Sequence, residues 1–288
     1  MNMQNAITTV SDSIERLHEA LLNGREGTIE KYLAATAQFH RYSFRNVLLI
    51  HEQFPDATVV AGFHAWKKRN RWVKKGEIGI SIFAPMIAGR NASKTESTED
   101  DGQAEDDRKR ITTNFRISYV FDISQTEGEP LVDLAPIVGS PGESLDALLD
   151  VYRKLEIKVV FTQLPHSVQG YSLGGEVRVR DDLDDAQAFR VLVHELAHEM
   201  MHKDIPFSNR DRKVLVETEA EAVACVVSQA FGIDHFERSA DYIALHQGDS
   251  MQLTKSLMRI HDTASKVIVM MEQQVGDSRF EQQQSHAA

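Results

Sequence analysis

The sequence predicts an α+β fold in which helices outweigh short strands. Apolar residues recur at helical spacing near the N-terminus, short β-branched runs follow them, and a group of short strands precedes two long helices in the second half of the chain. We therefore expect a helical and mixed N-terminal domain. A second domain should follow, in which a small antiparallel sheet packs on helices.

The N-terminal part is predicted to begin with three helices. Residues 5–23 form the first, and Gly24 ends it. The second covers about residues 28–40, and the third runs from about 43 to 53 and stops before Pro55. The apolar stripe of the first helix consists of Ile7, Val10, Ile14, Leu17 and Leu21.

A smaller mixed region follows these helices. FHAWKKRN, at 63–70, predicts a short helix, and the β-branched runs at 78–86 and 114–124 predict buried strands. Residues 89–110 carry seven acids between 96 and 107 and almost no side chain that would enter a core. This composition is typical of a flexible, solvated insertion between two strands.

The second part is predicted to begin near residues 136–144, where Pro and Gly cluster. SLDALLDVYRKL predicts a helix, IKVVF a strand, and GYSLGGEVRVR two strands that turn at Gly174 and Gly175. Long helices are expected over about 183–203 and 213–231, and a last amphipathic helix over about 250–273. The predicted divisions are therefore a domain over 1–135, a domain over 136–275 and a loose tail over 276–288.

Composition excludes some classes of protein. The single cysteine cannot form an internal disulfide. The apolar runs are too short to span a bilayer, and the first residues lack a basic start followed by an apolar block. We therefore expect a cytoplasmic protein with no membrane partner. Its single cysteine, Cys225, lies among Ala and Val and is expected to be a small core residue.

Charge is unevenly distributed along the chain. Residues 1–88 carry 11 basic and 8 acidic residues, whereas residues 111–288 carry 16 and 28. Six of the basic residues lie within KKRNRWVKK. Cations can follow a phosphate backbone while aromatic faces stack on unpaired bases, although tryptophans can equally be core anchors beside a solvated lysine face. The candidate single-stranded-DNA contacts are Trp66, Lys67, Lys68, Arg69, Arg71, Trp72, Lys74 and Lys75, with Tyr42 and Arg45.

The segment VLVHELAHEMMH, at 191–202, predicts a metal site. His194 and His198 are four residues apart, so both imidazoles lie on one helix face and can reach one metal ion. Glu195, next to the first histidine, is the candidate general base. Both histidines lie one position away from the apolar stripe, where a purely structural helix would more usually carry Ala, Leu or Lys. We expect Zn²⁺, with another divalent ion such as Mn²⁺ as the alternative.

The third ligand is expected from the helix that contains VETEAEAVACVV. Glu217 and Glu221 lie one turn apart beside its buried stripe, whereas Glu219 is rotated towards solvent. We assign Glu217 as the ligand and Glu221 as the partner of a histidine ring. The exchanged assignment, and surface ion pairs without a metal, are the alternatives.

A straight helix places His202 about 12 Å from His194 along its axis, too far for a shared metal. His202 is therefore expected to face solvent or the substrate cleft. An additional group that stabilises the oxyanion is expected in such a site, and His202 and Tyr242 are weak candidates.

The chain also resembles a known family. HELAH followed by an ExxxE helix is similar to the gluzincin arrangement, especially in ImmA/IrrE-like and ArdC-type metallopeptidase domains. Upstream, YSFRNVLLI, FPDATVVAGFHAWKKRNRWVKKGEIGISIFAPM and FRISYVFDISQTEGEPL resemble the N-terminal domain of ArdC antirestriction proteins, and the acidic insertion departs from that pattern.

The resemblance implies a single-stranded-DNA-binding domain joined to a zinc-peptidase-like domain, carried by a mobile element such as a plasmid. The expected function is protection of incoming DNA from host restriction. Two alternatives remain open. One is a non-enzymatic protein that coats single-stranded DNA and holds a structural metal. The other is a regulatory protease with a protein substrate, such as a repressor.

Overall fold

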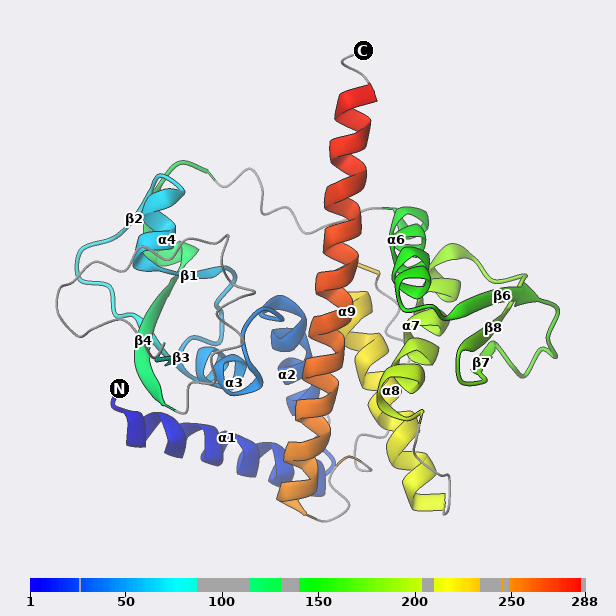
Figure 1. The fold of residues 1–288 in the computed structure, drawn as a ribbon. Helices are drawn as coiled ribbons and strands as arrows, with labels where there is room; N and C mark the ends of the chain where they lie inside the picture. The colour runs from blue at the N-terminus through cyan, green and yellow to red at the C-terminus, as the bar shows by residue number, and fades with distance from the viewer. Residues whose placement is uncertain are drawn as a thin grey trace.

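A computed structural model describes residues 1–25, 27–86, 114–130, 140–203, 210–233, 245 and 249–285, with side chains up to residue 274. The predicted acidic insertion at 89–110 and Tyr242 lie outside the described residues, as do residues 136–139 of the predicted domain boundary. The fold is mixed α+β, as predicted (Figure 1). None of the described helices is both long and apolar enough to cross a membrane.

Three helices form the N-terminal part, as the sequence predicts. They are α1 (Met3–Leu22), α2 (Gly27–Gln38) and α3 (Phe44–Gln53). The side chain of Asn2 accepts a hydrogen bond from the backbone N–H of Asn5 and so caps α1. The three helices pack against one another and bury their apolar faces.

A three-stranded antiparallel sheet packs beside α3. Its strands are β1 (Val60–Gly62), β3 (Ile80–Pro85) and β4 (Phe115–Asp122), in the order β1-β4-β3. Asn46 and Gln53, two turns apart on α3, each donate to and accept from backbone groups of β3. The side-chain amides thus satisfy the free edge of the sheet, where another strand would otherwise pair.

A smaller unit lies against this sheet. It contains the short helix α4 (Phe63–Lys68), as predicted, the strand β2 (Arg71–Val73), the 3₁₀ turn η1 (Ile123–Gln125) and the strand β5 (Thr126–Gly128). β2 and β5 pair antiparallel. Gly128 has φ of +136°, and a Cβ there would lie 2.2 Å from the carbonyl oxygen of Asn70, so this position requires glycine.

The second half begins with α6 (Pro141–Lys154), which Ser140 and Glu143 cap reciprocally. β6 (Lys158–Thr162), β7 (Gly170–Ser172) and β8 (Glu176–Arg180) follow, in the order β6-β8-β7. The prediction of an antiparallel sheet was wrong for one pair. β7 and β8 form an antiparallel hairpin, but β6 pairs parallel to β8, because the segment between β6 and β7 carries the chain to the far side of β8.

Three long helices complete the fold: α7 (Asp185–Met201), α8 (Arg210–Ala230) and α9 (Ser250–Ser285). α9 stands between the N-terminal helices and the pair α7 and α8 (Figure 1), and it contacts helices of both halves. The prediction of its end near residue 273 was too early, and the segment expected to be a loose tail is helical through Ser285. The end of the helix was predicted where its apolar stripe stops, and the helix continues beyond that point through a polar sequence.

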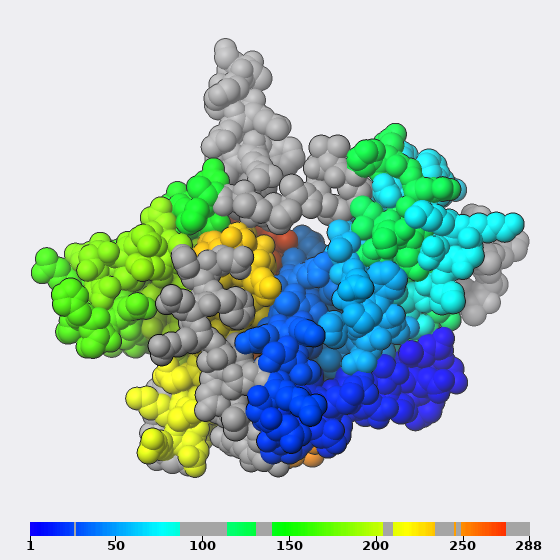
Figure 2. Space-filling model, turned by 180° about the vertical axis from the view of Figure 1, so that it is seen from behind, coloured from blue at the N-terminus to red at the C-terminus, as the bar shows by residue number. Residues whose placement is uncertain are grey.

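The apolar core runs without a break from α1 to α9. Leu257, Ile260 and Ala264 of α9 are fully buried within it. From behind, the N-terminal helices lie beneath the N-terminal strands, on the side opposite the sheet of β6, β7 and β8 (Figure 2). α2 also contacts α8 directly. The division at residues 135 and 136 stays a prediction, and any domains there share one core.

Candidate metal centre

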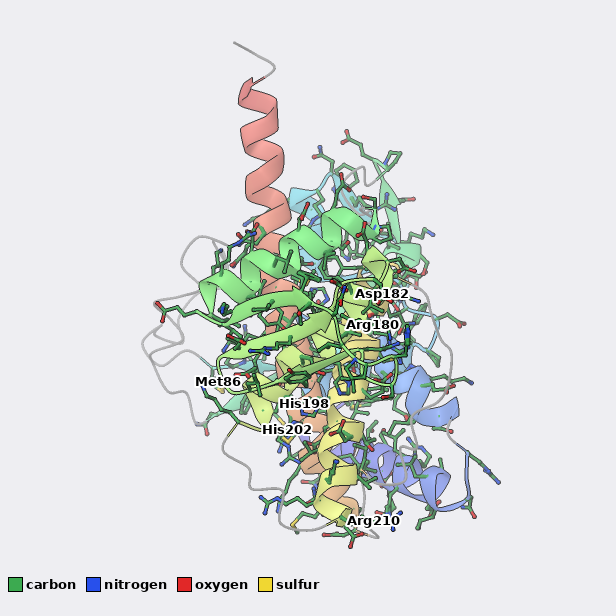
Figure 3. All side chains as sticks on the ribbon, turned by 90° about the vertical axis from the view of Figure 1, so that its right-hand side faces the viewer. Met86, Arg180, Asp182, His198, His202 and Arg210 are labelled. Atoms are coloured by element: carbon green, nitrogen blue, oxygen red, sulfur yellow. The ribbon has the colours of Figure 1, made fainter. Side chains whose placement is uncertain are left out.

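α7 presents the two histidines of the HELAH segment on one face. Asp184 and Gln187 cap the start of the helix reciprocally, and the fully buried Leu192 and Leu196 fix its rotation against the core. That rotation leaves His194 and His198 at the edge of the core, facing α8. Figure 3 shows His198 one turn before His202, which ends the helix.

Glu217 of α8 completes a triangle with the two imidazoles. The Nε2 atoms of His194 and His198 lie 3.0 Å apart, and the Glu217 Oε2 atom lies 3.5 Å and 3.6 Å from them. A tetrahedral zinc with bonds of 2.0–2.2 Å holds its ligand atoms about 3.3–3.6 Å apart. The two distances to Glu217 lie in this range, and the two imidazole nitrogens are about 0.3 Å closer together than its lower end. The set of two imidazoles and one carboxylate therefore suits a divalent metal ion, which would need only a small separation of the two rings.

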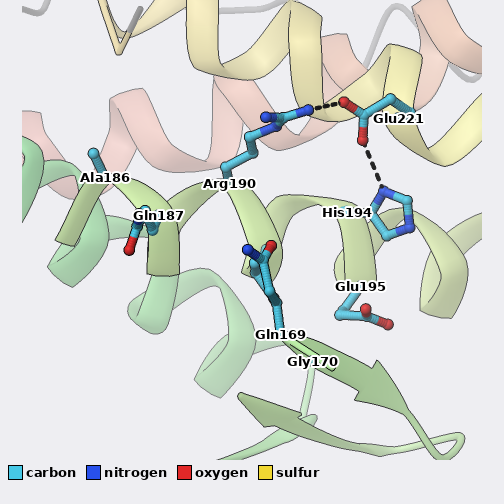
Figure 4. Close-up of a pocket in the computed structure, with 9 residues that line it drawn as sticks. Gln169, Gly170, Ala186, Gln187, Arg190, His194, Glu195 and Glu221 are labelled. Atoms are coloured by element: carbon cyan, nitrogen blue, oxygen red, sulfur yellow. Dashed lines mark hydrogen bonds and ion pairs between the residues drawn. The ribbon is translucent and has the colours of Figure 1, made fainter. Parts of the chain in front are cut away.

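The outer nitrogen of His194 is held by Glu221. Its Nδ1 atom lies 3.3 Å from the Glu221 Oε2 atom, and Arg190 donates to the other oxygen of that carboxylate (Figure 4). Because Nδ1 then carries the donated proton, Nε2 is free to offer its lone pair to a cation. This is the geometry expected when Glu217 binds the metal and Glu221 orients a histidine. The exchanged assignment would need Glu221 on the other side of the ring.

Electrostatics also favour a positive charge within the triangle. Burial lowers the pKa of His194, but the carboxylates of Glu217 and Glu221 outweigh it and raise that pKa to about 9. Hydrogen bonds from His194 and His198 hold the pKa of Glu217 well below its usual range. Without a metal, the site therefore holds a proton at neutral pH, in the place that suits a cation.

Glu195, the predicted general base, lies close enough to His194 and His198 to feel their charge. It is 8% exposed, and burial raises the pKa of its carboxyl although the neighbouring histidines oppose the shift. Together with His194 it lines a cavity of about 540 Å³ that also includes Gln169, Gly170 and Arg190 (Figure 4). A general base transfers protons most effectively when its pKa lies near the working pH, and the raised pKa of Glu195 is a shift in that direction.

β7 forms the edge of the sheet beside this cavity. Glu199, on α7, accepts hydrogen bonds from the Ser172 hydroxyl and from the backbone N–H groups of Gly174 and Gly175, both at 2.8 Å. The hairpin of β7 and β8 is therefore fixed to the helix that carries the histidines. Gly170 permits the close approach, because a Cβ there would lie 2.6 Å from the Val191 Cγ1 atom.

The expectations for Glu219 and His202 were wrong. Neither faces solvent or the cavity: both side chains are 1% exposed, and the His202 Nε2 atom lies 3.0 Å from the Glu219 Oε2 atom. Glu219 does point away from Glu217 on α8, as two residues on a helix must. However, α9 covers that face and supplies Arg259 as a second partner for Glu219.

Sequence reasoning also missed Arg190, Glu199 and Arg259. Arg190 stands four residues before His194, so the helical period could have placed it beside the metal-binding face. Arg259 is separated from Glu219 by 40 residues, and nothing local in the sequence links them. Cys225 is partly buried and packs against the core, in agreement with its predicted role.

Comparison with known proteins identifies the first part of the chain. Residues 2–121 match the family described as the N-terminal domain of the anti-restriction factor ArdC. Residues 2–121 therefore belong to the ArdC N-terminal domain family.

One solved structure has a fold similar to that of this chain. The crystal structure of the antirestriction protein ArdC from the R388 plasmid, in its Mn(II)-bound form, aligns with a TM-score of 0.52 and 18% identity. The alignment covers 92% of this chain and 97% of the R388 protein. The metal-free R388 structure aligns with a TM-score of 0.46 over 82% of this chain and 86% of that chain, again at 18% identity.

A relative from Bacillus anthracis, described as an uncharacterized protein, is 26% identical over 287 residues. The match covers 86% of this chain and 48% of the relative, so the chain spans about half the length of that relative.

The ArdC N-terminal domain contains the predicted nucleic-acid contacts, and two of these were wrong. Trp66 is fully buried, and its Nε1–H donates to the Phe121 carbonyl oxygen at 2.9 Å, so its ring is a core anchor and offers no face to a base. Arg71 is 9% exposed, and its guanidinium binds the backbone and hydroxyl of Thr126. Its charge therefore stabilises the pairing of β2 with β5.

The other predicted contacts lie nearer the surface. Trp72 is 50% exposed. Tyr42 is partly buried and donates its hydroxyl to the Val60 carbonyl oxygen. Phe63, an aromatic residue of the same basic segment, is 49% exposed. Sequence reasoning missed the exposed rings of Phe115 and Tyr119, because the prediction of a strand does not by itself reveal which side chains lie on its outer face. The exposed cations of the prediction are Arg45, Lys67, Lys68, Arg69, Lys74 and Lys75.

Proposed function

We propose that this protein is a metal-dependent peptidase with a single-stranded-DNA-binding N-terminal domain, and that it protects incoming DNA from restriction. One observation carries the enzymatic part. His194, His198 and Glu217 direct three ligand atoms at one point, with the buried Glu195 beside it. Such a cluster of facing acceptors is unfavourable unless a proton or a cation lies between them.

The proposed metal is Zn²⁺, because two imidazoles and one carboxylate with room for water form a common catalytic zinc set. Mn²⁺ is the alternative, and the R388 relative is described in an Mn(II)-bound form. When bound, the ion would acidify a water molecule and polarise a peptide carbonyl group.

The residues around the metal would then have separate roles in peptide hydrolysis. Glu195 takes the proton of the attacking water and passes it to the leaving amine. Glu221 and Arg190 keep the His194 ring in one orientation. β7, the edge strand beside the cavity, offers backbone groups to an extended peptide.

The DNA-binding part rests on the surface of the N-terminal domain. Exposed aromatic rings and cations occur together on α4 and on β2 and the segment that follows it, and stacking together with phosphate contacts needs no particular base sequence. The match to the ArdC N-terminal domain supports the same proposal.

The enzymatic proposal is tested with Glu195→Gln in the full chain. We expect the variant to bind Zn²⁺ as the wild type does and to lose cleavage of an unfolded protein substrate, measured with and without single-stranded DNA. Glu15→Gln, an exposed carboxylate of α1, is the control. Undiminished cleavage by Glu195→Gln would refute the proposed role of this residue.

A DNA-protection assay on the same variant separates the proposal from simple coating of DNA. Protection that requires Glu195 supports the peptidase. Protection that survives Glu195→Gln supports a non-enzymatic coating protein whose metal is structural.

A further inference from the structure

A line of buried polar groups extends from the back of His198 through α8 to α9. The His198 Nδ1 atom lies 3.2 Å from the His202 Nδ1 atom. The His202 Nε2 atom lies 3.0 Å from the Glu219 Oε2 atom, and Arg259 of α9 donates to the other oxygen of Glu219. His198 and His202 stand next to each other on the side of the molecule that Figure 3 shows.

The protons in this line have one consistent arrangement. A histidine that directs its Nε2 lone pair into the triangle must carry its proton on Nδ1 when neutral. That proton is donated to His202 Nδ1, which must then be an acceptor. His202 therefore carries its own proton on Nε2 and donates it to Glu219, which is an acceptor only.

Burial makes this arrangement stable. The side chains of His202 and Glu219 are each 1% exposed, so water cannot readily replace either partner. Each oxygen of the Glu219 carboxylate accepts a hydrogen bond, one from His202 and the other from Arg259. The carboxylate thus remains an acceptor at the end of the line.

His194 shows a shorter version of the same design. Its Nδ1 atom meets Glu221 directly, and Arg190 caps that carboxylate. Each imidazole of the triangle is therefore supported by a glutamate of α8 and by an arginine that binds that glutamate. The arginine is Arg190 of α7 for His194 and Arg259 of α9 for His198. For His198, the link to Glu219 runs through His202.

We propose that His202 and Glu219 are positioning residues that hold His198 in its Nδ1–H form, and that Arg259 extends this support to α9. The inference rests on the metal centre of the proposed function. It predicts that metal affinity depends on residues that do not touch the metal, because the outer partner fixes the orientation and basicity of a histidine ligand.

The experiment measures the affinity of the metal-free full chain for Zn²⁺ alone by competition with a chelator. His202→Phe removes the acceptor for His198 and is expected to weaken zinc binding about 10- to 100-fold. His202→Gln can accept with its amide oxygen and donate with its amide nitrogen, so it should recover most of the affinity.

Two further variants keep the result interpretable. Tyr152→Phe removes a buried 2.6 Å hydrogen bond from α6 to the Leu192 carbonyl oxygen of α7, the helix that carries His198. This variant should leave zinc affinity unchanged, even if it lowers the melting temperature. Arg259→Gln changes a partly exposed side chain and should fold even if His202→Phe does not. It should produce a smaller loss of affinity.

Three outcomes distinguish the failures. Equal zinc affinity in wild type, His202→Phe and Arg259→Gln would overturn the inference and leave these residues as links between helices. Absence of zinc and manganese binding in the wild type would overturn the proposed function. In that case ¹⁵N NMR of the imidazoles still tests the inference: a proton on His198 Nδ1 supports it, and a proton only on Nε2 overturns it.

Discussion

The Nε2 atoms of His194 and His198 lie 3.0 Å apart, closer to each other than either lies to the Oε2 atom of Glu217. Their outer nitrogens face Glu221 and His202, so the inner nitrogens converge on one point. Such convergence is favourable only around a positive charge. A proton provides that charge in the metal-free protein, and a divalent ion would provide more of it.

Zinc should therefore stabilise the folded chain. At a free concentration 100 times its dissociation constant, a ligand that binds only the folded state adds about 2.7 kcal/mol to the free energy of unfolding. We expect a higher melting temperature with Zn²⁺ than after treatment with a chelator. A melting temperature that zinc leaves unchanged would contradict the site.

Glu217→Ala and Glu221→Ala should differ in zinc content. The first removes an atom of the triangle, so zinc should be lost at stoichiometric concentration. The second removes only the partner of His194 Nδ1, so zinc should remain bound with about 10- to 100-fold lower affinity. Zinc per chain, measured by elemental analysis, distinguishes them, and the reverse order would favour Glu221 as ligand.

Much of the site could be predicted from helical period alone. The four-residue spacing of His194 and His198 places both side chains on one face of one helix. The same spacing places Glu217 and Glu221 on one face of the next helix. Glu219 shows the limit of this reasoning. The helical period tells which face of α8 carries Glu219, but it does not tell which element packs on that face. α9 lies there, and its register against α8 depends on packing across the whole core.

The N-terminal surface shows the same limit. Short apolar runs predict β3 and β4 correctly, since β-branched residues identify strands locally. Trp66 and Trp72 look alike in sequence, yet one ring is buried and the other half-exposed. α4 and β2 turn them to opposite environments, which depends on the pairing of β2 with β5, 55 residues away.

The two tryptophans should therefore respond differently to substitution. Trp72→Ala should weaken binding to single-stranded DNA by about 1–3 kcal/mol and barely affect folding. Trp66→Ala should lower the free energy of unfolding by about 3–5 kcal/mol. Fluorescence anisotropy and denaturant titration measure the two effects.

Replacement of the exposed cations Lys67, Lys68 and Arg69 by alanine should weaken DNA binding and flatten its dependence on salt. Each phosphate contact contributes about −0.7 to the slope of log K against log salt for single strands. The salt titration is repeated with Lys31→Ala, an exposed lysine on α2, as the control. Equal slopes in all three proteins would place the DNA elsewhere.

Gly170→Ala should disturb the edge strand without touching the metal triangle. The added Cβ would meet Val191 Cγ1 at 2.6 Å and the Arg178 carbonyl oxygen at 3.0 Å, so β7 must move away from α7. We expect a loss of about 1–3 kcal/mol in unfolding free energy and slower peptide cleavage, with zinc still bound. Gly62→Ala, where a Cβ meets nothing within 4 Å, is the matched control.

Asp122 should make the stability of the N-terminal domain depend on pH. Its Oδ2 atom accepts the backbone N–H groups of Thr58 and Val59, at 2.6 Å and 3.0 Å, and its Oδ1 atom accepts that of Ser124 at 2.9 Å. Burial would raise the pKa of Asp122, but these hydrogen bonds lower it below its ordinary value of 3.8. The charged form is therefore favoured by folding.

Because the folded-state pKa lies below the unfolded value, this stabilisation is present above about pH 4 and is lost as pH falls through the folded-state pKa. Asp122→Asn keeps one accepting oxygen and turns an N–H₂ group towards backbone donors, so it should cost about 1–3 kcal/mol at pH 7. Urea unfolding at pH 7 and pH 3 should show the difference from wild type shrinking at the lower pH, whereas the exposed Asp12→Asn should show little difference at either. A difference that stays constant between the two pH values would mean that the charge of Asp122 does not stabilise the fold.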